Sequence, residues 1–332
     1  MRRASGNVCQ FCLKWPPTTQ SVYTNYNSLM TSIPLQSVDR KIYLTGLAIG
    51  IVGAILFSAK AIVAKLIYRY DVDAVTLIMF RMLFAFPLFA AVAVWKAKTE
   101  LPLSRTDRIR IVFLGLVGYY LSSFLDFLGL QYISAGLERL ILFLTPSFVL
   151  LLSFFFYKRR ITMLEWGALG LSYLGTVLVF LHDVRLGGSN IGLGSVLVLG
   201  AAISYSLYLL LSGELVSRVG ALRLVAYAMC VSCVACIVQF FLLRPASMLL
   251  QPAPVYGLSM INAVLCTVLP VFLTMIAVAR IGAATSAQAG MVGPVSTLFL
   301  GALILQEPIT GIQLTGTTLV LTGIYLISKK KV

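Results

Sequence analysis

The chain has 332 residues, of which 59% are hydrophobic and only 11% are charged, whereas soluble domains carry about a quarter charged residues. This composition excludes a water-soluble globular domain, and apolar runs long enough to cross a bilayer recur after residue 42. The net charge of +15 lies almost entirely between these runs, where membrane topology accounts for it, so we expect no nucleic-acid partner.

The first 42 residues are polar, contain the pair Pro16 and Pro17, and lack the apolar segment of a signal peptide. We expect residues 1–42 to form a disordered cytoplasmic tail. Met30 is an alternative start, which leaves open whether residues 1–29 belong to the protein. Cys9 and Cys12 form a CxxC pair without a second ligand pair, so we expect neither a metal site nor a cofactor.

The apolar runs predict an all-α integral membrane protein. Ten transmembrane helices are expected at residues 43–67, 75–95, 110–130, 135–157, 163–181, 191–212, 221–243, 255–279, 284–306 and 309–328. Loops on alternate sides of these helices differ sharply in charge. One side has Arg69, Arg185 and Arg244, while the other side collects sixteen Lys and Arg residues. This asymmetry predicts that both termini are cytoplasmic.

An internal repeat relates the two halves of the chain. A shift of 148 residues places Tyr132–Phe180 on Arg280–Ser328 without a gap, and it aligns Pro146 with Pro294 and Gly175 with Gly323. We expect one five-helix repeat over residues 43–181 and a second over 191–328. Because five is odd, the second repeat would enter the membrane from the opposite side, as in many secondary transporters.

Ionisable residues within the predicted helices are rare, and an unpaired charge there costs about 2.5–3.5 kcal/mol on insertion scales. The first repeat is predicted to hold a cluster of them in the outer half of the membrane: Lys60, Arg81, Asp126, Glu138 and Arg139. We hypothesise that Asp126 and Glu138 offset Lys60 and Arg139, and that substrate or a proton replaces one of these pairings during transport.

Asp126 also has helical spacing with Tyr119, Ser122 and Ser123, which predicts one polar face directed into the bundle or a wet cavity. Structural roles are open as well. Lys60 and Lys65 would then snorkel to the interface, Arg81 would tie helix ends together, and Asp126 would pair with a lysine for folding. Glu138 would cap the start of its helix.

The second repeat has polar rather than charged residues at matching places, since Asp126 aligns with Thr274 and Glu138 with Ser286. Asn262 and Gln288 are candidates for the substrate pathway, and interhelical hydrogen bonding is their alternative role. Pro146 and Pro294 fall inside predicted helices and are expected to kink them. The kinks suit either a rocking motion or simple close packing.

Three features resemble the EamA family of the drug/metabolite transporter superfamily. They are Lys65 followed by Arg81, the segment GLQYISAGLERLILFLTPSFVLLLS, and the segment ARIGAATSAQAGMVGPVSTLFLGALILQEPITGIQLTGTTLVLTGIYLI with Glu307 and Gly323. The resemblance covers nearly all of residues 43–328. Two departures are Tyr157-Lys-Arg-Arg, where the family often has Gly-Glu-Arg, and the charged pair Glu138-Arg139.

The resemblance implies a secondary transporter of the inner, cytoplasmic membrane that moves an amino acid, an amino-acid derivative or a similar solute by alternating access, with export the expected direction. Its partners would be the small-molecule substrate, the bilayer and a coupling proton, and the protein would be a monomer or homodimer. The alternatives are a nucleotide-sugar carrier of the same superfamily and a non-transporting membrane protein. Catalysis is not expected, because His182, the single histidine, lies in a loop beside Asp183.

Overall fold

The computed structural model describes residues 40–158, 161–185 and 190–329. By its internal contacts the chain divides after Tyr43, and Leu44–Val332 forms one compact unit. The described residues are helical, with no strand among them. The expected tail at 1–42 therefore lies almost wholly outside the described residues.

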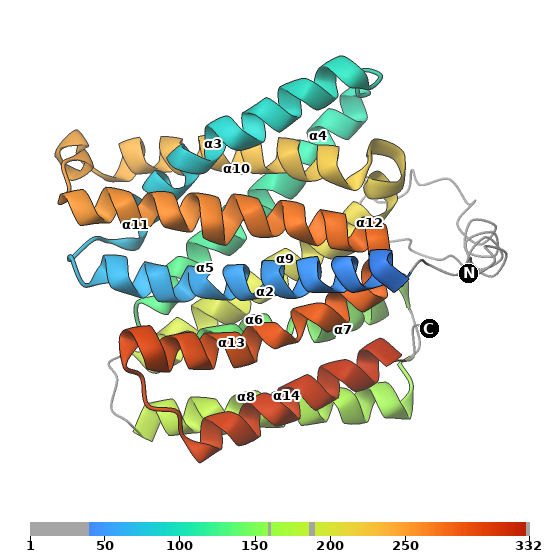
Figure 1. Ribbon diagram of the computed structural model, residues 1–332, viewed down its shortest axis with the longest axis vertical. Helices are drawn as coiled ribbons and strands as arrows, with labels where there is room; N and C mark the ends of the chain where they lie inside the picture. The colour runs from blue at the N-terminus through green and yellow to red at the C-terminus, as the bar shows by residue number, and fades with distance from the viewer. Residues whose placement is uncertain (1–39, 159–160, 186–189, 330–332) are drawn as a thin grey trace, which may run out of the picture. The chain divides into compact units, whose positions relative to one another are not determined.

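In the first half, the described residues form seven α-helices and one π-helical segment (Figure 1). They are α2 (Arg40–Tyr68), α3 (Ala74–Thr99), α4 (Arg105–Leu114), η1 (Gly115–Leu121), α5 (Ser122–Leu130), α6 (Ala135–Leu142), α7 (Thr145–Tyr157) and α8 (Met163–Arg185). Side-chain caps explain where several of these helices start. Asp73 accepts from the backbone N–H of Val75 before α3, and Ser134 accepts from that of Leu137 before α6, each at 3.1 Å.

The second half contains α9 (Ile191–Val219), α10 (Ala221–Leu243), η2 (Ala246–Leu249), α11 (Ala253–Ala263), η3 (Val264–Val268), α12 (Leu269–Gly290), α13 (Val292–Leu300), η4 (Gly301–Leu305) and α14 (Gly311–Lys329). Gly220 separates α9 from α10 with a φ of 84°, a conformation that favours glycine. Helices α4, η1 and α5 follow one another without a break, as do α11, η3 and α12.

The helices are long and apolar enough for a membrane protein. Among the described residues, eight helical stretches meet the length and hydropathy of a transmembrane span, and two shorter apolar helices follow at Val292–Leu305 and Gly311–Leu326. Large apolar side chains are widely exposed, including Phe155 at 72% and Leu242 at 77%. Such a surface suits lipid rather than water, so the chain is a multi-pass membrane protein.

The two predicted kinks coincide with helix interruptions. Helix α6 ends at Leu142, and α7 starts at Thr145 with Pro146 in its first turn. Helix α12 ends at Gly290, and α13 starts at Val292 with Pro294 in its first turn. Proline suits a first helical turn because its missing N–H has no intrahelical acceptor there.

Helix α12 turns back on itself near the predicted loop at 280–283. A β-carbon placed on Gly50 of α2 would lie 3.4 Å from Ala277 Cβ and 3.2 Å from Ala289 Cβ. On a straight helix twelve residues span about 18 Å, so these two alanines could not both reach one point. The chain therefore reverses between them, although its helical hydrogen bonding continues.

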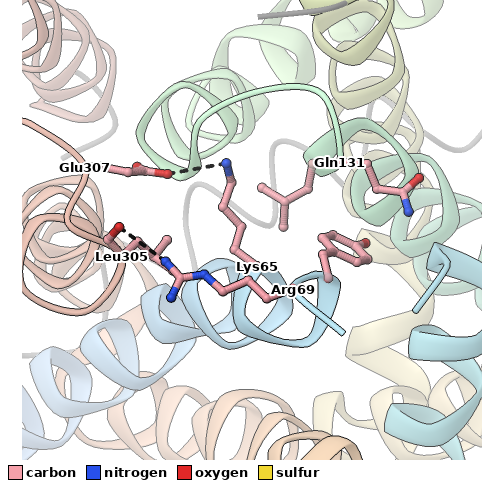
Figure 2. A pocket seen from close by; sticks show the side chains of 7 residues that line it. Lys65, Arg69, Gln131, Leu305 and Glu307 are labelled. Atoms are coloured by element: carbon pink, nitrogen blue, oxygen red, sulfur yellow. Dashed lines mark hydrogen bonds and ion pairs between the residues drawn. The ribbon is translucent and has the colours of Figure 1, made fainter. Parts of the chain in front are cut away.

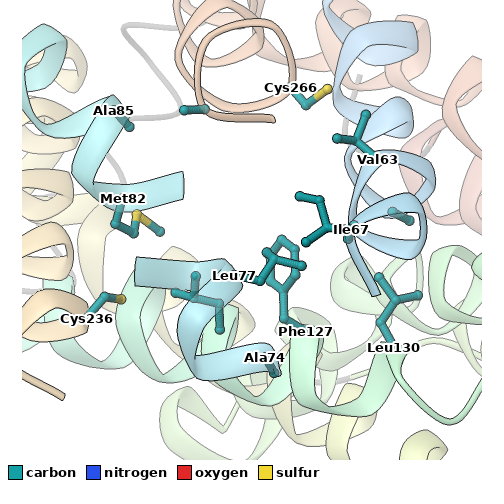
Figure 3. Close-up of a cluster of buried hydrophobic side chains, with 14 of the residues drawn as sticks. Val63, Ile67, Ala74, Leu77, Met82, Ala85, Phe127, Leu130, Cys236 and Cys266 are labelled. Carbon is teal, nitrogen blue, oxygen red and sulfur yellow. The ribbon is translucent and has the colours of Figure 1, made fainter. Parts of the chain in front are cut away.

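The bundle is held together by closely packed helix pairs and by a buried apolar core. Helices α8 and α14, the last of the two halves, pack side by side, as do α3 and α10 (Figure 1). The largest apolar core joins α2, α3, α5, α10 and η3, with Ile67, Leu77, Phe127 and Cys266 among its buried members (Figure 3). Phe127 follows Asp126 directly, so this core borders the charged residues.

Candidate functional site

Five ionisable side chains form one buried cluster in the first half of the chain. Lys60, Arg81 and Asp126 are each 4% exposed, Arg139 is 5% exposed, and Glu138 is fully buried. They come from α2, α3, α5 and α6. We call these five residues the charged cluster.

Lys60 is the centre of the charged cluster. Its Nζ forms an ion pair with Asp126 Oδ2 and a second with Glu138 Oε1 at 3.2 Å. Because Lys60 belongs to α2, Asp126 to α5 and Glu138 to α6, a single ammonium group ties three helices together. Lys60 therefore does not snorkel to the interface, and Ser134 rather than Glu138 caps α6.

Arg139 lies where α6 meets α2 and α13. Its Nη2 donates to Ser58 Oγ at 3.2 Å, and the Ser58 hydroxyl lies 3.0 Å from the carbonyl oxygen of Gly293. A β-carbon on Gly293 would lie 2.6 Å from Arg139 Nη2, so glycine makes room for the guanidinium. The guanidinium carbon also lies 5.0 Å from the ring centroid of Phe57 and 5.2 Å from that of Phe143.

Arg81 connects α3 to the second half of the chain. Its Nε donates to Thr267 Oγ1 at 2.8 Å, and that hydroxyl donates to the carbonyl oxygen of Asn262, also at 2.8 Å. The Asn262 amide donates in turn to the carbonyl oxygen of Lys60 at 3.4 Å. Asn262 and Thr267 thus form interhelical hydrogen bonds beside the charged cluster.

Several buried atoms of the charged cluster have no hydrogen-bond partner among the described residues. Two are donors, Arg81 Nη1 and Arg139 Nε, and two are acceptors, Asp126 Oδ1 and Glu138 Oε2. Buried polar groups in folded proteins are nearly always paired, because an unsatisfied one costs about 1–3 kcal/mol. A ligand that reached the charged cluster would find these four groups available for hydrogen bonds.

The structure does not bring every predicted residue to the charged cluster. Tyr119 bonds to the Tyr208 hydroxyl at 3.2 Å, and Ser122 donates to the carbonyl oxygen of Ala201 at 3.1 Å, so both face α9. The π-helical turn η1 changes the register that regular helical spacing assumed. Ser123 is half-buried on the same stretch of helix. The side chain of Gln288 lies outside the described residues.

Sequence reasoning missed the polar partners of the arginines and the pocket at the end of α2. Lys65 Nζ lies 3.3 Å from Glu307 Oε1, and Arg69 donates to the carbonyl oxygen of Leu305 at 3.4 Å (Figure 2). These residues line a pocket of about 310 Å³ with Tyr68, Leu130 and Gln131. Only the acidic residue in an otherwise apolar stretch, Glu307, could have signalled this pair.

The pocket lies next to the charged cluster. Tyr68, which lines it, donates to the carbonyl oxygen of Phe127 at 2.7 Å. The Phe127 ring centroid lies 5.3 Å from Lys60 Nζ. Tyr68 and Gln131 also line a second pocket of about 350 Å³ together with Asp71, Val72 and Asp73. Tyr68 and Phe127 thus separate these pockets from the buried charges.

Several proteins with similar sequences are named as transporters. The uncharacterized transporter YcbK of Bacillus subtilis (strain 168) is 32% identical over 279 residues, which cover 80% of this chain and 87% of that protein. The uncharacterized transporter sll1319 of Synechocystis sp. is 23% identical over 313 residues, covering 87% and 94%. A solved crystal structure shares the fold with a TM-score of 0.60 at 16% identity, covering 85% of this chain and 96% of that one.

The profile of the EamA-like transporter family matches the chain twice, over residues 44–181 and 192–329. The two matches confirm the resemblance drawn from the sequence segments around Pro146 and Pro294. With the family profile and a relative both covering most of its length, the chain belongs to the EamA-like transporter family.

Proposed function

We propose that this protein is a secondary carrier that moves a small metabolite across the cytoplasmic membrane by alternating access, with export as the direction. Ten spans would form two inverted five-helix repeats, at residues 43–181 and 191–328, with both termini in the cytoplasm. Amino acids and their derivatives are the substrates that the family resemblance implies.

The observation that carries this proposal is the ion-paired lysine of the charged cluster. Lys60 contacts two carboxylates inside a bundle whose outer surface is apolar. Intramembrane charges are expensive, and where they persist they mark substrate or proton pathways. A lysine shared by two carboxylates can release one of them when a proton or a substrate group takes its place. Such an exchange provides a binding step that differs between two states.

The repeated framework supports alternating access. The interruption of α6 and α7 at Phe143–Leu144 aligns, under the shift of 148 residues, with the interruption at Met291. Interrupted helices near a pseudo-symmetry axis are typical places for transporter binding sites. Here Arg139, just before the first interruption, meets Gly293, just after the second. The charged cluster therefore lies where the two repeats would move against each other.

The ion pair between Lys65 and Glu307 supports the same mechanism. It joins the end of α2 to the segment after η4, and so it links the two repeats beside the pocket in Figure 2. Both side chains are about one-quarter exposed, so the pair is accessible to water. A carrier that opens at this end would break the pair, and one that closes there would form it.

Metabolite profiling of cells tests the proposal. Cells that express the wild-type protein should show one or a few metabolites shifted between cytoplasm and medium, relative to cells without the gene. Asp126→Asn should remove this shift while the protein remains in the membrane, because Lys60 loses an ionised partner. Asp107→Asn, which changes a carboxylate paired with Arg218 at 3.0 Å, serves as the control. Full activity in Asp126→Asn would contradict the role given to the charged cluster.

A further inference from the structure

The charged cluster contains more positive than negative groups. Lys60, Arg81 and Arg139 oppose Asp126 and Glu138, which leaves one positive charge in excess. A guanidinium stays protonated under all protein conditions. Both carboxylates are already ion-paired with Lys60. If either carboxylate bound a proton, the positive excess would grow.

Neither arginine has a carboxylate at ion-pair distance in the described part of the chain. Arg81 bonds to the neutral hydroxyl of Thr267, and Arg139 bonds to that of Ser58. Arg81 Nη1 and Arg139 Nε, both on side chains more than nine-tenths buried, donate to nothing. Excess charge in a low-dielectric interior is strongly unfavourable, so the two arginines favour an anion beside them.

Aromatic rings connect the three cations. The Phe127 ring centroid lies 4.8 Å from the guanidinium carbon of Arg81 and 5.3 Å from Lys60 Nζ. The Phe57 ring lies similarly between Lys60, at 5.5 Å, and Arg139, at 5.0 Å. Ring faces offset part of the cost of a buried cation, but they do not neutralise it. They also give the site apolar walls that suit the carbon skeleton of an organic ion.

We propose that the charged cluster binds a small organic solute that has one net negative charge, and that the carboxylate of this solute pairs with Arg81 or with Arg139. This inference rests on the proposed transport function and adds the substrate class. Guanidinium groups match the planar geometry of a carboxylate and form charge-assisted hydrogen bonds with it. A monoanion cancels the excess charge, whereas a zwitterion or neutral solute leaves it and a dianion reverses it.

Binding to the purified full-length protein in detergent tests this assignment. The probes are pairs that differ in one carboxylate: lactate and lactamide, benzoate and benzamide, and glutamate and glutamine, with choline as a cation. In at least one pair the carboxylate member should stabilise the protein against thermal unfolding and bind at least about tenfold more tightly than its amide, as expected for hydrogen bonds to charged groups.

Matched variants separate the arginines from general effects. At least one of the two variants Arg81→Gln and Arg139→Gln should lose the preference for the carboxylate member, while Arg218→Gln, at an exposed ion pair, should keep it. Arg139→Lys retains the charge and should retain a weaker preference, which covers the case in which a neutral variant fails to fold. The inference is overturned if no anion stabilises the protein, if amides or choline bind equally well, or if the glutamine variants keep the preference.

The outcome is distinguishable from failure of the transport function. Movement of neutral or cationic solutes across the membrane, without anion binding, would leave the transport function standing and remove the substrate class. Anion binding that depends on Arg139, without movement of any solute, would support the assigned ligand class and contradict the transport function.

Discussion

Lys60 shows how a single side chain organises the interior. Within the described residues, its ammonium group is the one ion-pair partner of both Asp126 and Glu138. In a buried pair the loss of one partner leaves a bare charge, which commonly costs about 3–5 kcal/mol. Lys60 therefore has a stabilising role as well as the proposed role in transport.

Replacing Lys60 tests its stabilising role. Lys60→Met should destabilise the protein by about 3 kcal/mol or more, because two carboxylates lose their cation. Lys60→Met combined with Asp126→Asn should recover part of the loss, since fewer buried charges remain. Thermal unfolding in detergent measures both, with the exposed Lys98→Met as control. Equal melting temperatures for Lys60→Met and wild type would show that the ion pairs contribute little.

The members of the charged cluster could be predicted from the sequence, but their pairing could not. Lys60, Asp126 and Glu138 stand out because ionisable residues are rare in apolar runs. The sequence interpretation paired Arg139 with a carboxylate. In the structure its guanidinium instead contacts the Ser58 hydroxyl and the rings of Phe57 and Phe143. That difference depends on how α6 is rotated against α2, which the spacing of residues along one helix does not determine.

Helices α8 and α14 pack through glycines. A β-carbon on Gly175 would lie 2.5 Å from the carbonyl oxygen of Gly316 and 2.9 Å from Leu319 Cβ. A β-carbon on Gly323 would lie 2.6 Å from the carbonyl oxygen of Ala168. Since apolar helices gain little from leaving lipid, close backbone contact of this kind is a main source of attraction between them. The last helices of the two halves are thus held together by their smallest residues.

Gly175→Ile should push α8 and α14 apart. We expect a clear fall in melting temperature in detergent, because overpacking typically costs about 1–3 kcal/mol. Gly170→Ile is the matched control on the same helix, since a β-carbon there would meet nothing within 4 Å. If Gly170→Ile lowers the melting temperature as much as Gly175→Ile does, the glycine contact has no special role.

The ion pair at the end of α2 gives a second prediction for the helices. Lys65→Glu and Glu307→Lys should each slow transport, because like charges would face each other across a 3.3 Å contact. The double exchange, Lys65→Glu with Glu307→Lys, should restore much of the rate. Transport rates in vesicles measure this. No loss in the single variants, or no recovery in the double variant, would show that the contact does not take part in the cycle.

Helix positions followed well from the sequence, and so did the interruptions beside Pro146 and Pro294, while the π-helical turn η1 did not. Every predicted run is helical over most of its length, because a span of about 20 apolar residues is a strong signal. No residue pattern marks the π-helical turn at Gly115–Leu121, as a proline marks the break at Phe143–Leu144. The chain reversal in α12 was predicted from its loop, although the structure keeps helical bonding through it.

The full bundle is predicted to have both ends in the cytoplasm, on the basis of sixteen Lys and Arg residues on one side against three on the other. A fluorescent protein fused after Val332 should therefore be bright in cells. A reporter that is active only outside the cytoplasm should work when inserted between Arg69 and Asp73. The opposite result at either place would reverse the orientation.

The two halves of the bundle contribute different chemistry to one site. The first half supplies all five members of the charged cluster, and the second supplies neutral partners, the Thr267 hydroxyl and the carbonyl oxygens of Asn262 and Gly293. The sequence predicted this division, because Asp126 and Glu138 align with Thr274 and Ser286. It could not predict which neutral groups would reach the arginines. Specificity is therefore expected to depend mainly on the first half.

Exchange of labelled metabolites across vesicles tests the central claim, transport by a carrier, even while the substrate is unidentified. Vesicles containing the purified protein are loaded with a carbon-13-labelled metabolite extract and placed in the same extract without label. A carrier predicts that a small set of metabolites exchanges label faster than in protein-free vesicles, and that Asp126→Asn abolishes the exchange. Label exchange no faster than in protein-free vesicles would contradict the account.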